Sequence, residues 1–225
     1  MADRHHISAA FSAELHSLRS QILDMGRLVD AHVGEAVRAL TERDPALATR
    51  VIEADRAVNL MELAIDEQCI RILALRQPAA SDLRFIASAL KMVTDLERIG
   101  DLAVNMAERV EVLSAGPPLA AGSQLSELAA TARKMLGDAL DAFVNGDSPK
   151  AETVISTDAA VDAGTARLIA EVEADMTRDP AAVRRGLATI FFAKHIERMA
   201  DHVTNVAEMV VYLVRGRDVR HAKAT

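Results

Sequence analysis

Acidic side chains at helical spacing are the groups in this sequence whose type and position could do chemistry. Glu97 and Asp101 are four residues apart, as are Glu197 and Asp201, so each pair lies on one face of a helix. Two like charges at this spacing cost about 0.2–0.5 kcal/mol on an isolated helix, and a bound cation reverses that sign. Clustered carboxylate and amide oxygens are ligands for hard ions such as iron(III), manganese, magnesium or calcium.

Further acidic and amide side chains follow the same spacing on two other segments. Asp158 and Asp162 form another four-residue pair, and the stretch 55–66 carries four polar side chains at helical steps. If two such helices lie side by side, their oxygens could close one site with several ligands in each half of the chain. The candidate metal ligands are Asp55, Asn59, Glu62, Glu97, Asp101, Asp158, Asp162, Glu197 and Asp201.

An ordinary solvated face is the alternative interpretation of these carboxylates. The chain has 33 acidic residues, and at that content chance gives a similar number of acidic pairs at this spacing. On this alternative, Arg98 and Arg198 are the ion-pair partners of the neighbouring carboxylates. Only the placement of two pairs at equivalent points of a repeat favours a metal site.

Other chemistry has little support in the sequence. No phosphate-binding glycine loop, no zinc-protease motif, no Glu-x-x-His of a di-iron bundle and no nucleophile motif occurs, so we do not expect an enzyme. Cys69 falls on an apolar stripe, which predicts a buried structural thiol. His195 and His202 flank the second acidic pair, where surface histidines are favoured over additional ligands.

An internal repeat places the acidic pairs at equivalent points. Residues 97–101 (Glu-Arg-Ile-Gly-Asp) recur 100 positions later as residues 197–201 (Glu-Arg-Met-Ala-Asp). Asn105 likewise recurs as Asn205. Such self-similarity predicts a duplicated structural unit.

The elements that must position these residues are predicted to be helices. Half of the residues are apolar but only 3% are aromatic, which favours an all-α fold over a β sandwich or barrel. Apolar side chains recur every three or four residues, with breaks at proline and glycine, which indicates six helices. Their approximate ranges are 11–40, 45–76, 81–113, 125–143, 154–176 and 180–214, with a turn at 145–149.

These helices are expected to form two tandem three-helix bundles related by a pseudo-twofold axis. The strongest break, Gly116-Pro117-Pro118 through Gly122-Ser123, predicts one repeat over 1–116 and the other over 117–225. The second repeat ends in a basic tail after residue 214. Asp44-Pro45 and Asp179-Pro180 each read as an N-cap followed by the first helical residue.

Charge and cysteine content narrow the range of partners. A net charge of −7 disfavours a nucleic-acid footprint, and a single cysteine excludes an intrachain disulfide. The N-terminal residues are polar, without the apolar core of a secretory signal, and no apolar run has the length of a membrane span. We therefore expect a cytoplasmic protein.

The sequence resembles the PhoU family of phosphate-specific transport system accessory proteins. The resemblance is carried by residues 50–67, 76–84, 96–101 and 193–202 and covers essentially the whole chain. It implies two three-helix bundles, frequent dimerisation and a regulator without catalytic activity. It also implies repression of the phosphate-starvation response, restraint of phosphate uptake, and a bridge between the ATPase of a phosphate ABC importer and a sensor histidine kinase.

The resemblance also implies multinuclear metal clusters, of iron or of zinc, manganese or magnesium, on E/D-x-x-x-D motifs. That pattern falls on the three four-residue acidic pairs, whereas Asp55 is followed by Asn59 in place of a second carboxylate. The side chains nearest the motifs that are expected to contact partners are Arg98, Arg198, Asn105 and Asn205. Two functions remain open: a signalling adaptor, and a protein whose main role is metal handling.

Overall fold

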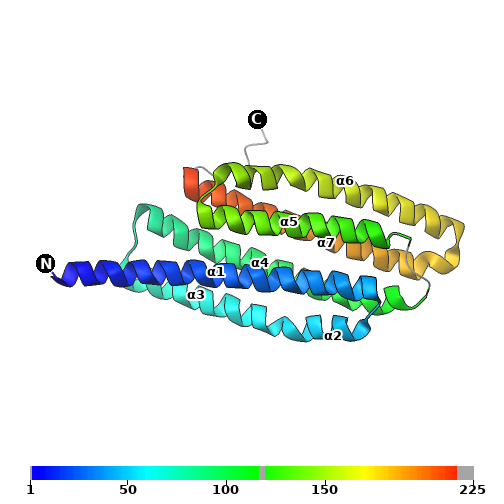
Figure 1. The fold of residues 1–225 in the computed structure, drawn as a ribbon, viewed down its shortest axis with the longest axis horizontal. Helices are drawn as coiled ribbons and strands as arrows, with labels where there is room; N and C mark the ends of the chain where they lie inside the picture. The colour runs from blue at the N-terminus through cyan, green and yellow to red at the C-terminus, as the bar shows by residue number, and fades with distance from the viewer. Residues whose placement is uncertain (1, 117–119, 217–225) are drawn as a thin grey trace.

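The computed structural model describes residues 2–116 and 120–216, with side chains from residue 9 onward, and every regular element in it is helical (Figure 1). The first half contains α1 (Ala2–Glu42), α2 (Pro45–Ala54), α3 (Arg56–Arg76) and α4 (Ala80–Ser114). The second half contains α5 (Gly122–Asn145), α6 (Ser148–Arg178), the short 3₁₀ helix η1 (Pro180–Ala182) and α7 (Val183–Arg215).

The helices run along the long axis of one elongated bundle, in which the two halves lie side by side (Figure 1). Helices α1, α2, α3 and α4 form one half, and α5, α6 and α7 form the other. The predicted all-helical fold of two three-helix units is therefore confirmed, with the second predicted helix divided into α2 and α3.

The division between α2 and α3 falls at Asp55, which the sequence analysis placed inside one helix. The Val58 N–H donates to the Asp55 carbonyl at 2.9 Å, a three-residue step that tightens the chain locally. Asp55 keeps right-handed helical backbone angles, and the apolar stripe continues from Val51 to Val58. Neither the spacing nor the residue types therefore revealed the break.

Aspartate side chains begin three of the helical elements. Asp44 accepts a hydrogen bond from the Leu47 N–H at 3.0 Å, as predicted, and Asp147 accepts one from the Lys150 N–H at 3.0 Å. The prediction at Asp179 was only partly right. Its side chain accepts from the Ala181 N–H and starts η1, so α7 begins three residues later than expected.

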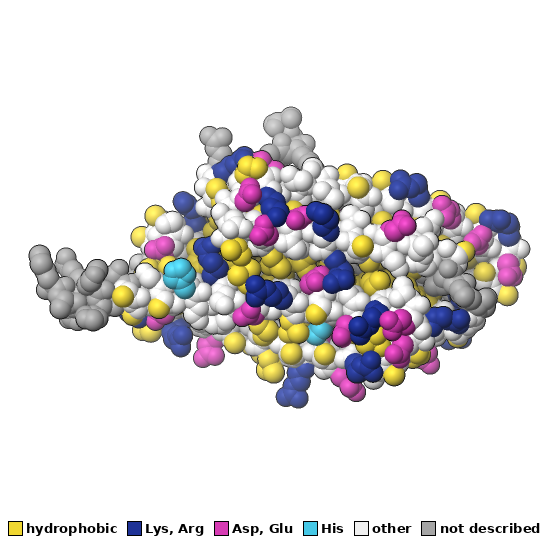
Figure 2. Space-filling model, in the orientation of Figure 1, with side chains coloured by type: hydrophobic (Ala, Val, Ile, Leu, Met, Phe, Trp, Pro, Cys, Tyr) yellow, Lys and Arg dark blue, Asp and Glu magenta, His cyan; other side chains and the backbone are white. Residues whose placement is uncertain are grey.

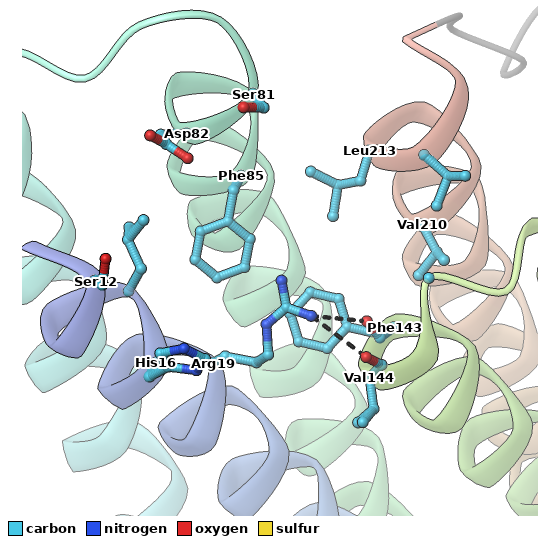
Figure 3. A pocket seen from close by; sticks show the side chains of 13 residues that line it. Ser12, His16, Arg19, Ser81, Asp82, Phe85, Phe143, Val144, Val210 and Leu213 are labelled. Carbon is cyan, nitrogen blue, oxygen red and sulfur yellow. Dashed lines mark hydrogen bonds between the residues drawn. The ribbon is translucent and has the colours of Figure 1, made fainter. Parts of the chain in front are cut away.

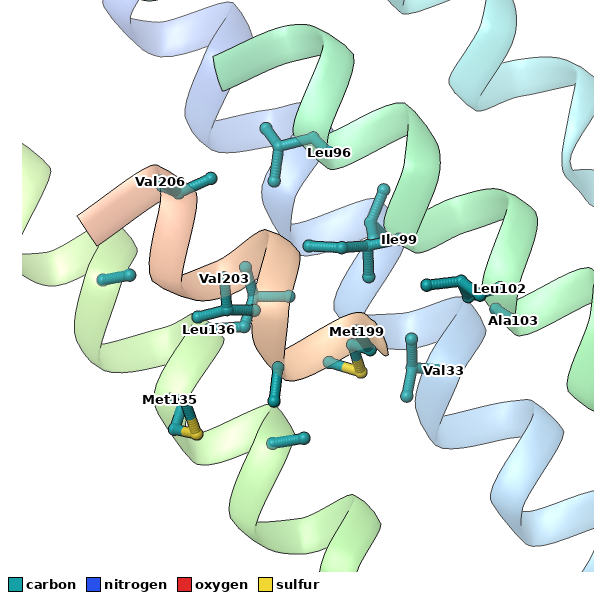
Figure 4. Close-up of a cluster of buried hydrophobic side chains, with 14 of the residues drawn as sticks. Val33, Leu96, Ile99, Leu102, Ala103, Met135, Leu136, Met199, Val203 and Val206 are labelled. Carbon is teal, nitrogen blue, oxygen red and sulfur yellow. The ribbon is translucent and has the colours of Figure 1, made fainter. Parts of the chain in front are cut away.

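The core lies between α4 and α7, which pack against each other in the middle of the bundle (Figure 4). Ile99 and Leu96 from α4 meet Met199 and Val203 from α7, and all four are fully buried. Cys69 is buried on α3, as predicted, and burial raises its pKa to about 12, so this thiol is unreactive at neutral pH.

A polar contact also joins α4 to α7 and hence one half to the other. The Asp95 carboxylate on α4 accepts a hydrogen bond from His202 Nδ1 at 2.8 Å and one from Asn205 Nδ2 at 3.0 Å. The side chains of Asp95 and His202 are only 13% and 22% exposed, so water competes weakly for these bonds.

Two arginines close the C-terminal end of α4. Arg43 donates to the carbonyls of Ser114 and Gly116, and Arg185 donates to the Leu113 carbonyl at 3.3 Å, so both contact the end of α4.

The predicted break at 117–119 and the basic tail beyond residue 216 lie outside the described residues. Among the described residues, no helix combines the length and apolarity required to cross a membrane.

Asp95→Ala is expected to destabilise the protein by about 1–3 kcal/mol, because it leaves two partly buried donors without their acceptor. For a chain of this size the Tm should fall by about 2–12 °C in thermal unfolding followed by circular dichroism. Asp24→Ala is the matched control, because Asp24 pairs with Arg27 on the surface, and its Tm should change by about 1 °C or less. An equal fall in both variants would contradict a role for the α4–α7 contact.

Candidate functional site

The first acidic cluster lies where α3 and the α2–α3 junction pack against α4. Asp55 stands at the junction, and Asn59 Nδ2 donates to its Oδ2 at 3.0 Å. Glu62 is on α3, and Glu97 and Asp101 are on α4. The structure therefore brings together candidates from two separate stretches of the sequence.

Gly100 allows α4 to approach the α2–α3 junction closely. A methyl group built on Gly100 would lie 3.2 Å from Val58 Cγ1 and 3.3 Å from Asp55 Oδ1, which is tighter than ordinary contact. The equivalent residue in the second half, Ala200, already carries that methyl group and is fully buried. The second half therefore accommodates a methyl group at the position where the first half has little room for one.

Burial and mutual repulsion make the carboxylates of the first cluster harder to ionise. The pKa of Asp55 is raised by burial and then by the nearby charge of Asp101. The pKa of Glu97, whose side chain is 15% exposed, is raised by burial and then by Asp101, and only partly offset by Arg98. The pKa of Glu62 is also raised, by burial and then by the charge of Asp66.

The second cluster lies between α6 and α7 and holds Asp158, Asp162, Glu197 and Asp201. The pKa of Asp201 is raised by burial, then by Asp162 and Glu197. Lys194 Nζ donates to both Glu197 oxygens, at 2.8 and 2.6 Å, so one carboxylate of this cluster is already neutralised by a lysine.

The donor chemistry of the clusters fits a hard cation, but the positions of the side chains do not complete a ligand set. Asp55 Oδ1 is buried without a hydrogen-bond partner among the described residues, which suits an oxygen that can act as a metal ligand. Throughout the described residues, however, no group of three or more His, Cys, Asp or Glu side chains is placed to hold one ion. Metal binding would require these side chains to move together.

The residues expected to contact partners have different surroundings. Arg98 is 3.5 Å from Glu97 and 3.2 Å from Asp101, so it belongs to the first cluster as an ion-pair partner. Asn205 bonds Asp95, and Asn105 is half-buried on α4. Arg198 forms no ion pair within the described residues, although it occupies the position equivalent to Arg98.

Three residues near these sites, Asp95, His32 and Arg109, were not singled out from the sequence. Asp95 links the two halves. His32, buried on α1, interacts electrostatically with Asp55, and burial lowers its pKa. Burial lowers the pKa of His195 to about 4, and the nearby charges of Arg109 and Arg198 act in the same direction, so this histidine is neutral. His32 continues the apolar stripe of the first helix, a signal that could have marked it as buried.

A cavity lies away from the acidic clusters, among residues of α1, α4, α5 and α7 (Figure 3). Its volume is about 630 Å³, and Arg19 lies over the rings of Phe85 and Phe143, 5.1 and 5.2 Å from their centroids. Arg19 Nη1 donates to the Phe143 and Val144 carbonyls at 3.4 Å, so it closes the end of α5. These contacts give the arginine a structural role.

The charges seen on the face formed by α1 and α5 are of both signs and interspersed (Figure 2). Arg133 from α5 forms a two-pronged pair with Asp30 from α1, at 2.8 and 2.9 Å. This face therefore offers no continuous basic stripe of the kind that binds nucleic acid.

Comparison with known proteins places the chain in a family. The PhoU domain model matches residues 22–110 and again residues 125–210, once in each half. A Pseudomonas putida protein described as a phosphate-specific transport system accessory protein PhoU homolog is 45% identical over 96% of this chain and 85% of its own length. The Escherichia coli PhoU accessory protein is 38% identical over 96% of this chain and 90% of its own length.

Solved structures agree with that assignment. The crystal structure of PhoU from Pseudomonas aeruginosa superposes with a TM-score of 0.89 at 44% identity, covering 92% of this chain and all of the other. PhoU from Streptococcus pneumoniae, a phosphate transport system regulatory protein, gives a TM-score of 0.87 at 33% identity, covering 93% of this chain and 99% of the other. The chain belongs to the PhoU family. Relatives in this family are described as phosphate-specific transport system accessory proteins, and this membership agrees with the expectation of a regulator without enzymatic activity.

Glu97→Gln is expected to stabilise the metal-free protein at neutral pH. Because the pKa of Glu97 is raised by folding, its ionised form costs stability above that pKa, and the amide removes this cost. Relief of about 0.5–1 kcal/mol from several like-charge neighbours should raise the Tm by about 1–4 °C in EDTA-treated protein.

The same reasoning gives a pH dependence. The difference in Tm between Glu97→Gln and the original chain should shrink as pH falls through the raised pKa of Glu97, because the original side chain then becomes protonated. Glu127→Gln, a substitution of an exposed acid on α5, should leave the Tm unchanged at every pH. A lower Tm for Glu97→Gln at neutral pH would refute the electrostatic description of the cluster.

Proposed function

We propose that this protein is a negative regulator of the phosphate-starvation response and a modulator of phosphate uptake. It acts in the cytoplasm as an adaptor between the ATPase of a phosphate ABC importer and a phosphate-responsive sensor histidine kinase. The observation that carries the proposal is similarity to PhoU accessory proteins over nearly the whole chain and over both repeats.

The shape of the molecule supports an adaptor. A duplicated bundle presents two related surfaces, around α3 and α4 and around α6 and α7, and these surfaces have diverged in sequence. Gly100 is replaced by Ala200, and Lys194 neutralises Glu197 only in the second half. Two similar but unequal surfaces suit simultaneous contact with two different partners. We take residues 1–116 and 117–225 as the two units, and we propose that the chain dimerises.

The decisive experiment is deletion of the gene in its native host, with alkaline phosphatase measured in phosphate-rich medium. The deletion strain should show high activity, and the intact gene should restore low activity, because repression then requires this protein. Activity that stays low in the deletion strain would contradict the proposal.

Cluster variants then test whether the carboxylates carry the signal. Glu97→Gln with Asp101→Asn, and Glu197→Gln with Asp201→Asn, should each restore repression incompletely, whereas Glu127→Gln should restore it fully. Immunoblots establish equal amounts of each variant. Full repression by both double variants would assign the clusters no part in regulation.

Metal binding by the clusters is the second candidate, favoured by the unpartnered Asp55 Oδ1 and the raised pKa values around it. If multinuclear clusters of iron, zinc, manganese or magnesium form, protein purified without chelator should contain more than about one metal ion per chain. Glu97→Ala and Asp201→Ala should lower that content and the Tm of the loaded protein. Metal at or below about one ion per chain, with no change in Tm, would exclude metal handling as the main role.

A further inference from the structure

Asp95 on α4 and His195 on α7 occupy equivalent positions of the internal repeat, one at each end of the α4–α7 contact. The side chains that surround these two residues differ. In one place, Asp95 on α4 accepts hydrogen bonds from His202 and Asn205 on α7. In the other, the 100-residue repeat substitutes His195 for Asp95, and the charge that His195 meets from α4 is that of Arg109. A carboxylate acceptor in the first place is therefore replaced by a neutral imidazole beside a cation in the second.

Polar groups around His195 are left without partners among the described residues, including a nitrogen of His195 itself. Arg109 contacts a single carboxylate within the described residues, that of its neighbour Glu108 at 3.4 Å, and its buried Nε has no hydrogen-bond partner there. Arg198 also lies within electrostatic reach of His195 and forms no ion pair with a described residue. Its equivalent, Arg98, is 3.2 Å from Asp101. Arg198 is thus without an anionic partner among the described residues, and Arg109 shares its charge with one exposed carboxylate, so both can bind an external anion.

An exposed aromatic side chain lies next to these cations. Phe191 is 53% exposed, and Arg109 Cζ lies 6.0 Å from its ring centroid. Leu187 and Val183, one and two turns earlier on α7, are also exposed. The equivalent positions of the first repeat carry Lys91, Ala87 and Leu83. The row of three exposed apolar side chains therefore occurs on α7 and not at the equivalent positions of α4. Exposed aromatic and arginine side chains are the types that anchor protein interfaces.

We propose that Val183, Leu187, Phe191, Arg109 and Arg198 form a docking surface for an acidic segment of a partner protein that also carries an apolar side chain. The carboxylates of that segment would accept from Arg109 and Arg198, and its apolar side chain would pack on Phe191. Charge supports this occupant, because Arg198 has no ion pair among the described residues and Arg109 has one exposed carboxylate, so an acidic segment would complement the two cations. The inference rests on the proposed adaptor function, since it names the surface for one of the two partners.

The probe is a fluorescein-labelled peptide of four glutamates, two leucines and one phenylalanine, with its glutamine analogue as a charge control. Fluorescence anisotropy at low salt should give a Kd of about 10–100 μM for the acidic peptide, with binding weakened as salt is raised. Arg109→Gln and Phe191→Ala should each weaken binding about tenfold. Lys91→Gln removes an exposed lysine at the equivalent of Phe191 and should change binding less than twofold.

Three results would overturn the surface: equal binding of the glutamine peptide, unchanged binding by both Arg109→Gln and Phe191→Ala, or an equal loss in Lys91→Gln. Unchanged Tm values show that the exposed substitutions leave the fold intact. The alkaline phosphatase assay of the deletion strain separates the two proposals. Low activity in that strain refutes the adaptor function, whereas the peptide data decide the surface.

Discussion

Small and branched side chains let α4 and α7 pack directly against each other through the middle of the molecule, and each remaining helix packs on one of these two. This contact also fixes where the chemistry lies. Because Ile99 and Ala103 point into the core, the helical repeat turns Glu97 and Asp101 sideways toward α3. The acidic motif is thus held between two helices by the same periodicity that builds the core, and its carboxylates are forced close together and partly out of water.

Much of this arrangement is readable from local sequence, because helices and their caps are set by nearest neighbours along the chain. Asp44 was predicted as an N-cap from the proline that follows it, and the residues that would be buried were predicted from their spacing. The break at Asp55 was not predicted, since its backbone remains helical and no glycine or proline marks it. The side-chain chemistry of the candidate ligands was also readable, but not their convergence, which depends on rotamers chosen by packing.

Contacts between distant residues were the part that the sequence could not supply. His202 and Asp95 are 107 positions apart, and nothing in the spacing of either helix pairs them. The internal repeat held a partial signal, since aligning Asp95 with His195 shows a change from anion to neutral ring at equivalent points. That change becomes meaningful only when α4 and α7 are seen to run antiparallel, with Arg109 opposite His195.

The arginines at the helix ends have a consequence for how the duplicated chain is held together. Arg185, from the second half, donates to the Leu113 carbonyl near the end of α4, and Arg19, from the first half, donates to the Phe143 and Val144 carbonyls near the end of α5. Each half therefore finishes a helix that belongs to the other, in addition to covering its apolar face. An isolated half would have to find these partners in a second copy of itself. The repeat is accordingly a unit of sequence, whereas the ends of α4 and α5 each depend on contacts with the other half.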